Sequence, residues 1–376
     1  MSRICGIIKS ILSKFYKNSY RKVRVFYFCQ MKDFIIVGAG IAGISFAETA
    51  YMENRSFTVT TDSSQNSSFV AAGIYNPVIL KRFSLPMDSK RHLEYSKSFY
   101  DTIQKRLSVK FDYNIPVYRK FTSFEEQNNW FEASDKITLA PFLSPELVHK
   151  KYEYLPALYG FGRVLHTGYI DTEVLLNNYH KFLYENGNLL NERFDFDELT
   201  VGSEYVTYRG IKAKHIVFAE GFGIHNNPYF NYLPLDGTKG ELLLIKAPLL
   251  KLDVIINAGI FILPLGNDIY KVGATYEWYD KSPEPTEAGK NELVEKLDEL
   301  ITCSYEVIGH YAGIRPTVKD RKALIGTHPE YSNVHLLNGL GTRGVMLGPP
   351  LAKDLYNCII NGNEIDKSVN LTRFKR

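Results

Sequence analysis

The feature that most constrains this chain is a glycine-rich segment placed between an expected strand and an expected helix. Residues 34–37 read FIIV, a short apolar run that is typical of a buried parallel strand. The next six residues read GAGIAG, and the ISFAETA that follows is typical of a helix. Strand, G-x-G-x-x-G and helix in this order predict a dinucleotide-binding fold, in which the N-terminus of the helix faces a pyrophosphate.

Each glycine of this segment has its own physical task. Gly38 permits the tight turn, Gly40 lets the backbone approach the pyrophosphate, and Gly43 lets the helix pack on the strand. The whole segment is expected to contact the cofactor: Gly38, Ala39, Gly40, Ile41, Ala42 and Gly43. A second strand is expected at residues 57–61, and Asp62 directly after it is placed to accept hydrogen bonds from ribose hydroxyls. A glycine-rich turn without a ligand is the alternative, which this full order disfavours.

The charge of the chain is unevenly distributed. The formal charge is +4, but residues 1–30 contain seven Lys or Arg and no acidic residue, so the remainder carries −3 and lacks the basic excess of many nucleic-acid binders. Lys9 interrupts the apolar run at residues 4–12, and no small-residue cleavage site follows, which disfavours a secretory signal. An organelle transit peptide, a membrane-surface helix or an upstream start codon with Met31 as the working start remain, and the last is favoured.

Cysteine and histidine usage argues against metal chemistry. The four Cys and nine His are dispersed, without a C-x-x-C pair, an H-E-x-x-H motif or a cluster at zinc spacing. We therefore expect no metal site and a reducing, cytoplasmic location. No apolar stretch approaches about 18 residues, so no membrane-spanning helix is expected.

The segment after the second expected strand carries the first resemblance to a known family. Residues 67–77 read SSFVAAGIYNP, and such small residues let the backbone lie close to a ligand. The stretch resembles the S-x-x-A-A-G segment of the D-amino-acid oxidase, glycine oxidase and sarcosine oxidase family of flavoproteins. The resemblance implies FAD as the cofactor, with Ala71, Ala72 and Gly73 beside the isoalloxazine ring.

Further blocks that resemble this family follow in the same order, to about residue 360. Residues 168–187 resemble its "G-x-(I/V)-D" turn and helix, with Asp171 or Thr172 as the expected N-cap. Residues 214–221 resemble a later strand of the FAD domain, although Glu220 departs from the small-residue pair that usually ends it.

The resemblance implies three positions near the substrate. Residues 312–326 resemble the family's A-G-(L/I)-R-P-x-x-x-D-x-x-P-x-I-G signature, in which the Arg, here Arg315, binds the substrate carboxylate. A buried structural ion pair is the alternative for Arg315. Phe261, in one of two neighbouring strands expected at 260–264 and 270–276, replaces a Tyr whose hydroxyl helps to hold that carboxylate in glycine and D-amino-acid oxidases. Lys271 stands where sarcosine oxidases place a Lys that assists reaction with oxygen, and a solvent-facing lysine is its alternative.

The last block is a glycine-rich turn that enters a helix. Residues 337–349 read LNGLGTRGVMLGP, and in the family this loop faces the flavin pyrimidine, where N–H groups stabilise negative charge. The cofactor-binding residues implied here are Gly339, Gly341, Thr342, Arg343, Gly344 and Val345. Sarcosine oxidases attach FAD covalently through a Cys just before their equivalent of Asp320. Residues 313–319 hold no Cys, so we expect non-covalent FAD.

The resemblance also implies an architecture of class α/β. A Rossmann-like FAD-binding domain is expected to be interleaved with an α+β substrate domain built on an antiparallel sheet. The FAD domain would use residues 31–85, 150–233 and 305–376, and the substrate domain residues 86–149 and 234–304. Residues 1–30 are treated as a basic extension outside this fold.

The activity implied is oxidation of the C–N bond of a small amino acid or N-substituted amino acid, by hydride transfer to the flavin. Oxygen or another acceptor would reoxidise the flavin, and no membrane partner is expected. One alternative is a flavin-dependent enzyme that trims the carboxymethyl group from a wobble-uridine carboxymethylaminomethyl group, which would make tRNA a partner. Another alternative is a protein that binds FAD without turnover.

Overall fold

The computed structural model describes residues 31–62, 64–86 and 88–374. The expectations for residues 1–30 therefore lie outside the described residues. Residues 32–376 form one compact unit, which is described below. Within the described ranges, no helix is both long enough and apolar enough to cross a membrane.

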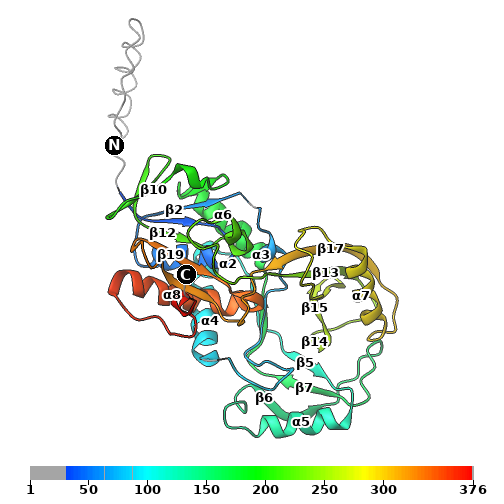
Figure 1. Cartoon of the computed structure of the whole chain (residues 1–376). Coiled ribbons are helices and arrows are strands. Elements are labelled where there is room, and N and C mark those ends of the chain that lie inside the picture. The colour runs from blue at the N-terminus through cyan, green and yellow to red at the C-terminus, as the bar shows by residue number, and fades with distance from the viewer. Residues whose placement is uncertain (1–30, 63, 87, 375–376) are drawn as a thin grey trace, which may run out of the picture. The chain divides into compact units, whose positions relative to one another are not determined.

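The glycine-rich segment directly follows a strand of the first large sheet (Figure 1). Its strands are β1 (Lys32–Val37), β2 (Phe57–Thr61), β9 (Leu189–Asn191), β10 (Leu199–Val201), β11 (Val206–Tyr208), β12 (Ile211–Phe218), β18 (Leu324–Thr327) and β19 (Val334–Asn338). Strand β1 lies between β2 and β12 in parallel register, β9 extends the parallel part beside β2, and β19 extends it beside β12. Strands β10, β11 and β18 add antiparallel pairs. The parallel centre confirms the expected dinucleotide-binding arrangement.

Apolar residues on both faces of β1 explain its central place. Phe34 and Ile36 enter one hydrophobic core, whereas Ile35 and Val37 enter another on the opposite face. A strand covered on both faces needs the continuous apolar run that the sequence shows. Helix α2 (Ile41–Met52) contacts β1 and β2, α6 (Thr172–Glu185) contacts β9, and α8 (Gly344–Asn361) contacts β18 and β19. Helix α4 (Ser89–Leu107) packs on α6 and α8.

A buried carboxylate joins three of these helices. Glu48 of α2 is fully buried, forms an ion pair with Arg106 of α4 and accepts a hydrogen bond from the hydroxyl of Tyr179 in α6 at 3.1 Å. Helix α6 begins where expected, because Asp171 Oδ1 accepts a hydrogen bond from the N–H of Val174 at 3.1 Å. These contacts fix the helices that support the glycine-rich segment.

The second large sheet is mostly antiparallel (Figure 1). Its strands, in spatial order, are β17 (Glu306–Arg315), β13 (Thr238–Lys246), β16 (Ile269–Gly273), β15 (Ile260–Gly266), β14 (Ile255–Ala258), β5 (Val117–Lys120), β7 (Phe161–Val164) and β6 (Leu143–Val148). Only the β14–β5 pair among them is parallel. Helix α7 (Glu287–Asp298) contacts β13, β15 and β16, and α5 (Phe124–Ser134) contacts β6. The α/β fold class with an antiparallel sheet is confirmed.

The remaining elements of the described residues are short. They are α3 (Ser67–Val70), the three-stranded sheet of β3 (Ile74–Tyr75), β8 (Gly168–Ile170) and β4 (Asp112–Tyr113), and the 3-10 turns η1 (Phe196–Glu198), η2 (Gly221–Asn226), η3 (Gly341–Arg343) and η4 (Leu371–Arg373). The domain boundaries stay a prediction. Strands β7 and β17 belong by sequence to segments assigned to the FAD domain, yet both pair in the second sheet.

Candidate active site

A large cavity is lined by residues from both large sheets. Its volume is about 1050 Å³, at the upper end of the range of roughly 300–1,000 Å³ typical of ligand sites. The cavity extends from the glycine-rich segment, past Ala71 and Arg315, to Arg119. It therefore has room for a dinucleotide together with a second molecule.

The glycine-rich segment forms one end of this cavity and fits its expected tasks. Residues 38–42 line the cavity, whereas Gly43 is used for packing, because a Cβ there would lie 1.8 Å from the carbonyl oxygen of Gly38. Gly38 has φ +100°, and a Cβ on it would lie 2.5 Å from the carbonyl oxygen of Ala219. The N–H of Ile41 donates to Ser68 Oγ at 3.1 Å, which ties α3 to the start of α2. Asp62 also lines this end, directly after β2.

The small residues after α3 form the adjoining wall. Ala71, Ala72 and Gly73 line the cavity, and Gly73 has no space for a side chain, since a Cβ would lie 1.8 Å from the carbonyl oxygen of Ile170. Lys271 Nζ donates to the carbonyl oxygen of Ala71 at 3.3 Å. This hydrogen bond places the amine against the wall, and burial lowers the pKa of Lys271.

The glycine-rich turn before α8 forms the opposite wall. Residues 341–345 line the cavity, whereas Gly339 is used for packing, because a Cβ there would lie 2.6 Å from Val318 Cγ2. The N–H of Gly341 donates to the carbonyl oxygen of Pro316 at 3.1 Å, which joins this turn to the end of β17. The turn and the strand that carries Arg315 are thus directly connected.

Arg343 on this wall has a buried side-chain donor without a hydrogen-bond acceptor among the described residues. Its Nη1 atom is buried and has no hydrogen-bond partner among the described residues, and burial lowers the pKa of the guanidinium. A buried unpaired donor costs about 1–3 kcal/mol, more for a charged group. An anionic ligand in the cavity removes that cost. Together with the close-packed glycines, this orphan cation fits the phosphate and pyrimidine acceptors of FAD.

Arg315 faces the cavity from the end of β17. A Cβ built on Gly240 would lie 1.9 Å from Arg315 Nη2, so the guanidinium lies directly over that glycine of β13. Arg315 Nη1 donates to the carbonyl oxygens of Thr275 at 3.2 Å and Lys239 at 3.4 Å, and the Tyr276 ring lies 4.6 Å from Cζ. No carboxylate of the described residues pairs with Arg315. Burial lowers the pKa of this guanidinium.

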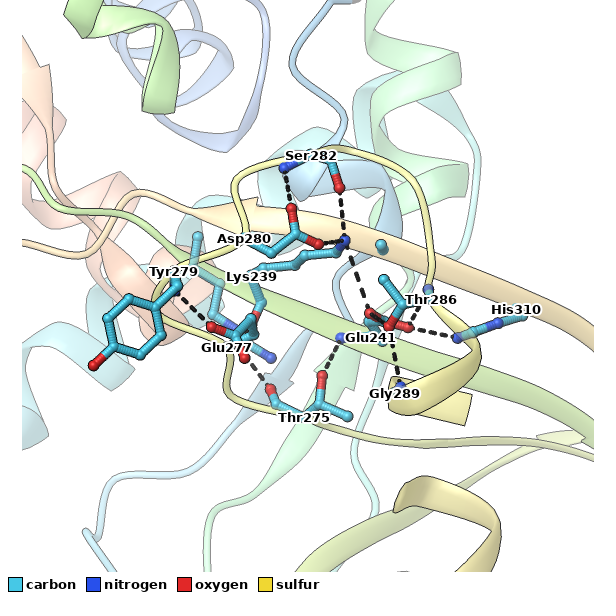
Figure 2. A network of polar contacts seen from close by, with 12 residues as sticks. Lys239, Glu241, Thr275, Glu277, Tyr279, Asp280, Ser282, Thr286, Gly289 and His310 are labelled. Carbon is cyan, nitrogen blue, oxygen red and sulfur yellow. Dashed lines mark hydrogen bonds and ion pairs between the residues drawn. The ribbon is translucent and has the colours of Figure 1, made fainter. Parts of the chain in front are cut away.

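A buried polar network surrounds Lys239 and Glu241 of β13 (Figure 2). Lys239 is fully buried, and its Nζ lies 2.5 Å from Asp280 Oδ2 and 2.9 Å from Ser282 Oγ. Glu241 accepts hydrogen bonds from the N–H and the hydroxyl of Thr286, and its Oε2 lies 2.8 Å from His310 Nε2. The Lys239 ammonium lowers the pKa of Asp280 to about 2. This network fixes the segment 275–286, which carries Tyr276, to β13.

The sequence patterns did not predict this network. A visible signal was the placement of Lys239 and Glu241 two residues apart in the otherwise apolar run TKGELLLIK, since a charged pair in a buried strand needs partners. The patterns also missed Arg119 and Asn257, which line the cavity beyond Phe261. Both belong to segments without a family pattern.

Glu220 lines the nucleotide end of the cavity, at a position where the family usually has a small residue. It follows β12, lines the cavity and accepts a hydrogen bond from Asn227 Nδ2 at 2.7 Å. Burial raises its pKa to about 8. The carboxyl is therefore mostly protonated at neutral pH and can lie near phosphates without strong repulsion.

Within residues 31–62, 64–86 and 88–374, no group of three or more His, Cys, Asp or Glu could hold a metal ion.

Comparison with known proteins agrees with the geometry. Residues 33–357 match the family described as FAD dependent oxidoreductase (DAO). The sequence is 24% identical to a glycine oxidase from Pseudomonas aeruginosa over 88% of this chain and 95% of that protein. It is 26% identical to the tRNA 5-methylaminomethyl-2-thiouridine biosynthesis bifunctional protein MnmC of Legionella pneumophila, over 41% of this chain and 24% of that protein. The structure of glycine oxidase from Geobacillus kaustophilus superposes with a TM-score of 0.79 at 17% identity, over 92% of this chain and all of that one.

Proposed function

The chain belongs to the FAD-dependent oxidoreductase (DAO) family, and we propose that it oxidises the C–N bond of a small amino acid or N-substituted amino acid. One observation carries the substrate class: Arg315 faces the cavity without a carboxylate partner among the described residues. Its guanidinium is held by two backbone carbonyls and an aromatic ring, so its orientation is fixed before any ligand arrives. A planar, pre-oriented guanidinium favours bidentate binding of a carboxylate.

The residues of this chain supply position rather than acid or base chemistry. The glycine-rich segments at 38–43 and 339–345 would hold FAD, which would supply the acceptor for the hydride of the substrate carbon. Arg315 holds the carboxylate, and Phe261 offers an apolar floor where relatives carry a hydroxyl. Holding the reacting atoms in line supplies a large part of such a rate enhancement. The substrate nitrogen loses a proton as its carbon loses hydride, and water then hydrolyses the resulting imine to an amine and an oxo acid.

Lys271 is proposed to assist the reaction of the flavin with oxygen. Its amine lies on the Ala71 carbonyl, in the wall assigned to the isoalloxazine ring, and its lowered pKa follows from burial. Release of hydrogen peroxide after air is admitted to the reduced enzyme supports oxygen as acceptor. A loss of that release in Lys271→Met, with anaerobic reduction retained, supports the role of the amine.

The decisive experiment is anaerobic bleaching of the flavin by a panel of amino acids and N-substituted glycines. Purified protein is expected to be yellow and to release intact FAD on heating. Arg315→Ala is expected to keep its FAD and to lose about 2–5 kcal/mol of substrate binding or transition-state energy. Arg315→Lys is expected to rescue only partly, because a point charge cannot replace a bidentate fork. A variant that unfolds early and loses FAD, while its holo fraction turns over normally, contradicts the assignment.

A second candidate function is the trimming of a carboxymethyl group from a wobble uridine of tRNA. The likeness to MnmC and the missing hydroxyl at Phe261 favour it, since both fit a bulky N-substituted glycine. The formal charge of −3 outside residues 1–30 argues against it. Mass spectrometry of tRNA nucleosides from a deletion strain tests it, and unchanged wobble nucleosides eliminate it.

A further inference from the structure

The cavity continues past Arg315 along one face of the second sheet. Register partners on adjacent strands place their side chains on the same face. Arg119 of β5 pairs with Asn257 of β14, and Asn257 pairs with Phe261 of β15. Phe261 pairs with Gly273 of β16, which pairs with Leu242 of β13. All five residues line the cavity, and we call them the floor row.

The two ends of the floor row are marked by guanidinium groups. The Arg315 guanidinium lies over Gly240, which shares a face of β13 with Leu242 two residues later. At the other end, Arg119 Nη1 donates to Asn257 Oδ1 at 2.8 Å, so its guanidinium leans over β14. The strand order β13-β16-β15-β14 puts three strand spacings between these groups, which is about 14 Å.

The end at Arg119 is rich in hydrogen-bond donors. Arg119 uses Nε and Nη2 to bind Glu126 Oε1 at 2.9 and 2.6 Å, so these contacts and the one to Asn257 occupy three of its five N–H groups. Asn257 accepts through Oδ1, which leaves its NH₂ group as the donor it can present. Lys81 also lines the cavity and adds a positive charge besides the Arg119–Glu126 ion pair.

Between the two ends the floor row is apolar. Leu242, Gly273 and Phe261 separate the Arg315 guanidinium from Asn257, and Phe261 lacks the hydroxyl that relatives carry at this place. A ligand that fits this order has an anionic group, an aliphatic stretch and a second acceptor-rich group. A free amino acid the size of glycine satisfies only the first requirement.

We propose that the preferred substrate is a secondary amine with two carboxylates: a carboxyalkyl group on one side of the nitrogen and, on the other, an aliphatic arm that ends in a second carboxylate. The inference rests on the proposed function, because Arg315 has to bind the first carboxylate. An arm of five methylenes separates the two carboxylates by roughly 10 Å when extended. Charge-assisted hydrogen bonds of about 2.8 Å at each end then bridge the distance to Arg315 and to the donors around Arg119. The arm leaves with the amine when the imine is hydrolysed, as described above.

The test uses three amines of graded fit with the FAD-loaded enzyme under nitrogen. N-(carboxymethyl)-6-aminohexanoate carries both carboxylates, N-hexylglycine has the same arm without the second carboxylate, and N-methylglycine has almost no arm. We expect the second-order rate constant of flavin reduction to be at least tenfold higher for the dicarboxylate than for N-hexylglycine. Equal constants for these two compounds overturn the inference.

Variants at the donor end sharpen the test. Lys81→Met, alone and combined with Asn257→Leu, is expected to raise KM for the dicarboxylate by a factor at least ten times larger than any change for N-methylglycine. The matched control Lys367→Met removes an exposed lysine elsewhere and is expected to leave the preference intact. A parallel loss for both substrates overturns the inference. Lys81 is exposed, so the single variant keeps the test valid if the double variant fails to fold.

Failure of this inference is distinguishable from failure of the proposed function. If N-methylglycine reduces the flavin in a manner that depends on Arg315, but the dicarboxylate gains nothing, only the second carboxylate site is wrong. If no amine of the series reduces the flavin, the proposed function and this inference fall together.

Discussion

The two ends of the cavity are built by different means. At the nucleotide end, the shape of the cavity depends on close packing of the backbone. Gly38, Gly43 and Gly73 leave so little space that an added Cβ would lie within 2.5 Å of a carbonyl oxygen. At the substrate end, side chains decide, with Arg315 fixed by carbonyl groups and by the segment 275–286. Close backbone packing tolerates little substitution, but the glycines that it requires are visible as a local pattern in the sequence. Side-chain placement tolerates change but depends on strands that are distant in the chain.

The largest effect is expected from Gly43→Ala, which tests the backbone end. The new Cβ would lie 1.8 Å from the carbonyl oxygen of Gly38, so the turn has to open. Overpacking of this kind typically costs about 1–3 kcal/mol, and here it also deforms the pyrophosphate site, so we expect protein without flavin. Flavin absorbance per mole of protein measures the loss. In the control Gly187→Ala, where φ is +67° and nothing lies within 4 Å, about 1 kcal/mol of strain and full flavin content are expected. Full flavin content in Gly43→Ala contradicts the backbone argument.

The second effect is expected from Arg343→Met, which tests whether a side chain contributes to FAD binding at the nucleotide end. Loss of charged hydrogen bonds is expected to weaken FAD binding by about 1.5–3 kcal/mol, or roughly 10- to 150-fold in Kd. The apoprotein is expected to gain thermal stability, because the variant removes a buried charge without a partner among the described residues. Titration of apoprotein with FAD and melting curves give both readouts. Arg163→Met, at an exposed arginine, serves as control and should change neither. An apoprotein that loses stability shows that Arg343 is structural.

A smaller effect is expected from Asp280→Asn at the substrate end. The variant weakens the 2.5 Å contact with buried Lys239 that fixes the segment carrying Tyr276 and the Thr275 carbonyl. We expect KM for amino-acid substrates to rise several-fold, on the order of 1 kcal/mol, with kcat nearly unchanged. Steady-state kinetics separate the two constants. Glu284→Gln, an exposed residue of the same segment, is the matched control. An equal fall in kcat and kcat/KM speaks against a positioning role.

The last effect concerns the pH dependence of apoprotein stability. Burial raises the pKa of Glu220 to about 8 from an ordinary value of 4.5, so between these values the folded state binds more protons than the unfolded state. Stability is therefore expected to fall as pH rises through this window. Glu220→Gln removes the ionisation, so the melting temperature of the variant relative to the original protein should increase from pH 5 to pH 8. A constant difference across this range indicates that Glu220 is already ionised.

Local sequence patterns predict the backbone end more fully than the substrate end. The strand at residues 57–61 and the Asp171 cap of α6 follow from local patterns, and both are confirmed. The site residues remain predictions, although the structure places most of them around one cavity. Arg119 and Asn257 could not be grouped from the sequence, because a register pair between β5 and β14 joins residues 138 positions apart. The contact between Lys239 and Asp280 likewise depends on a loop whose course no periodicity predicts.

The hydrogen bond between Gly341 and Pro316 has a mechanical consequence. It joins the glycine-rich turn before α8 to the strand end that carries Arg315, at an N···O distance of 3.1 Å. Because one backbone hydrogen bond connects them, the distance between Arg315 and this turn depends little on how the two whole sheets move against each other. We expect this distance to vary less with thermal motion than the distances between other parts of the cavity wall.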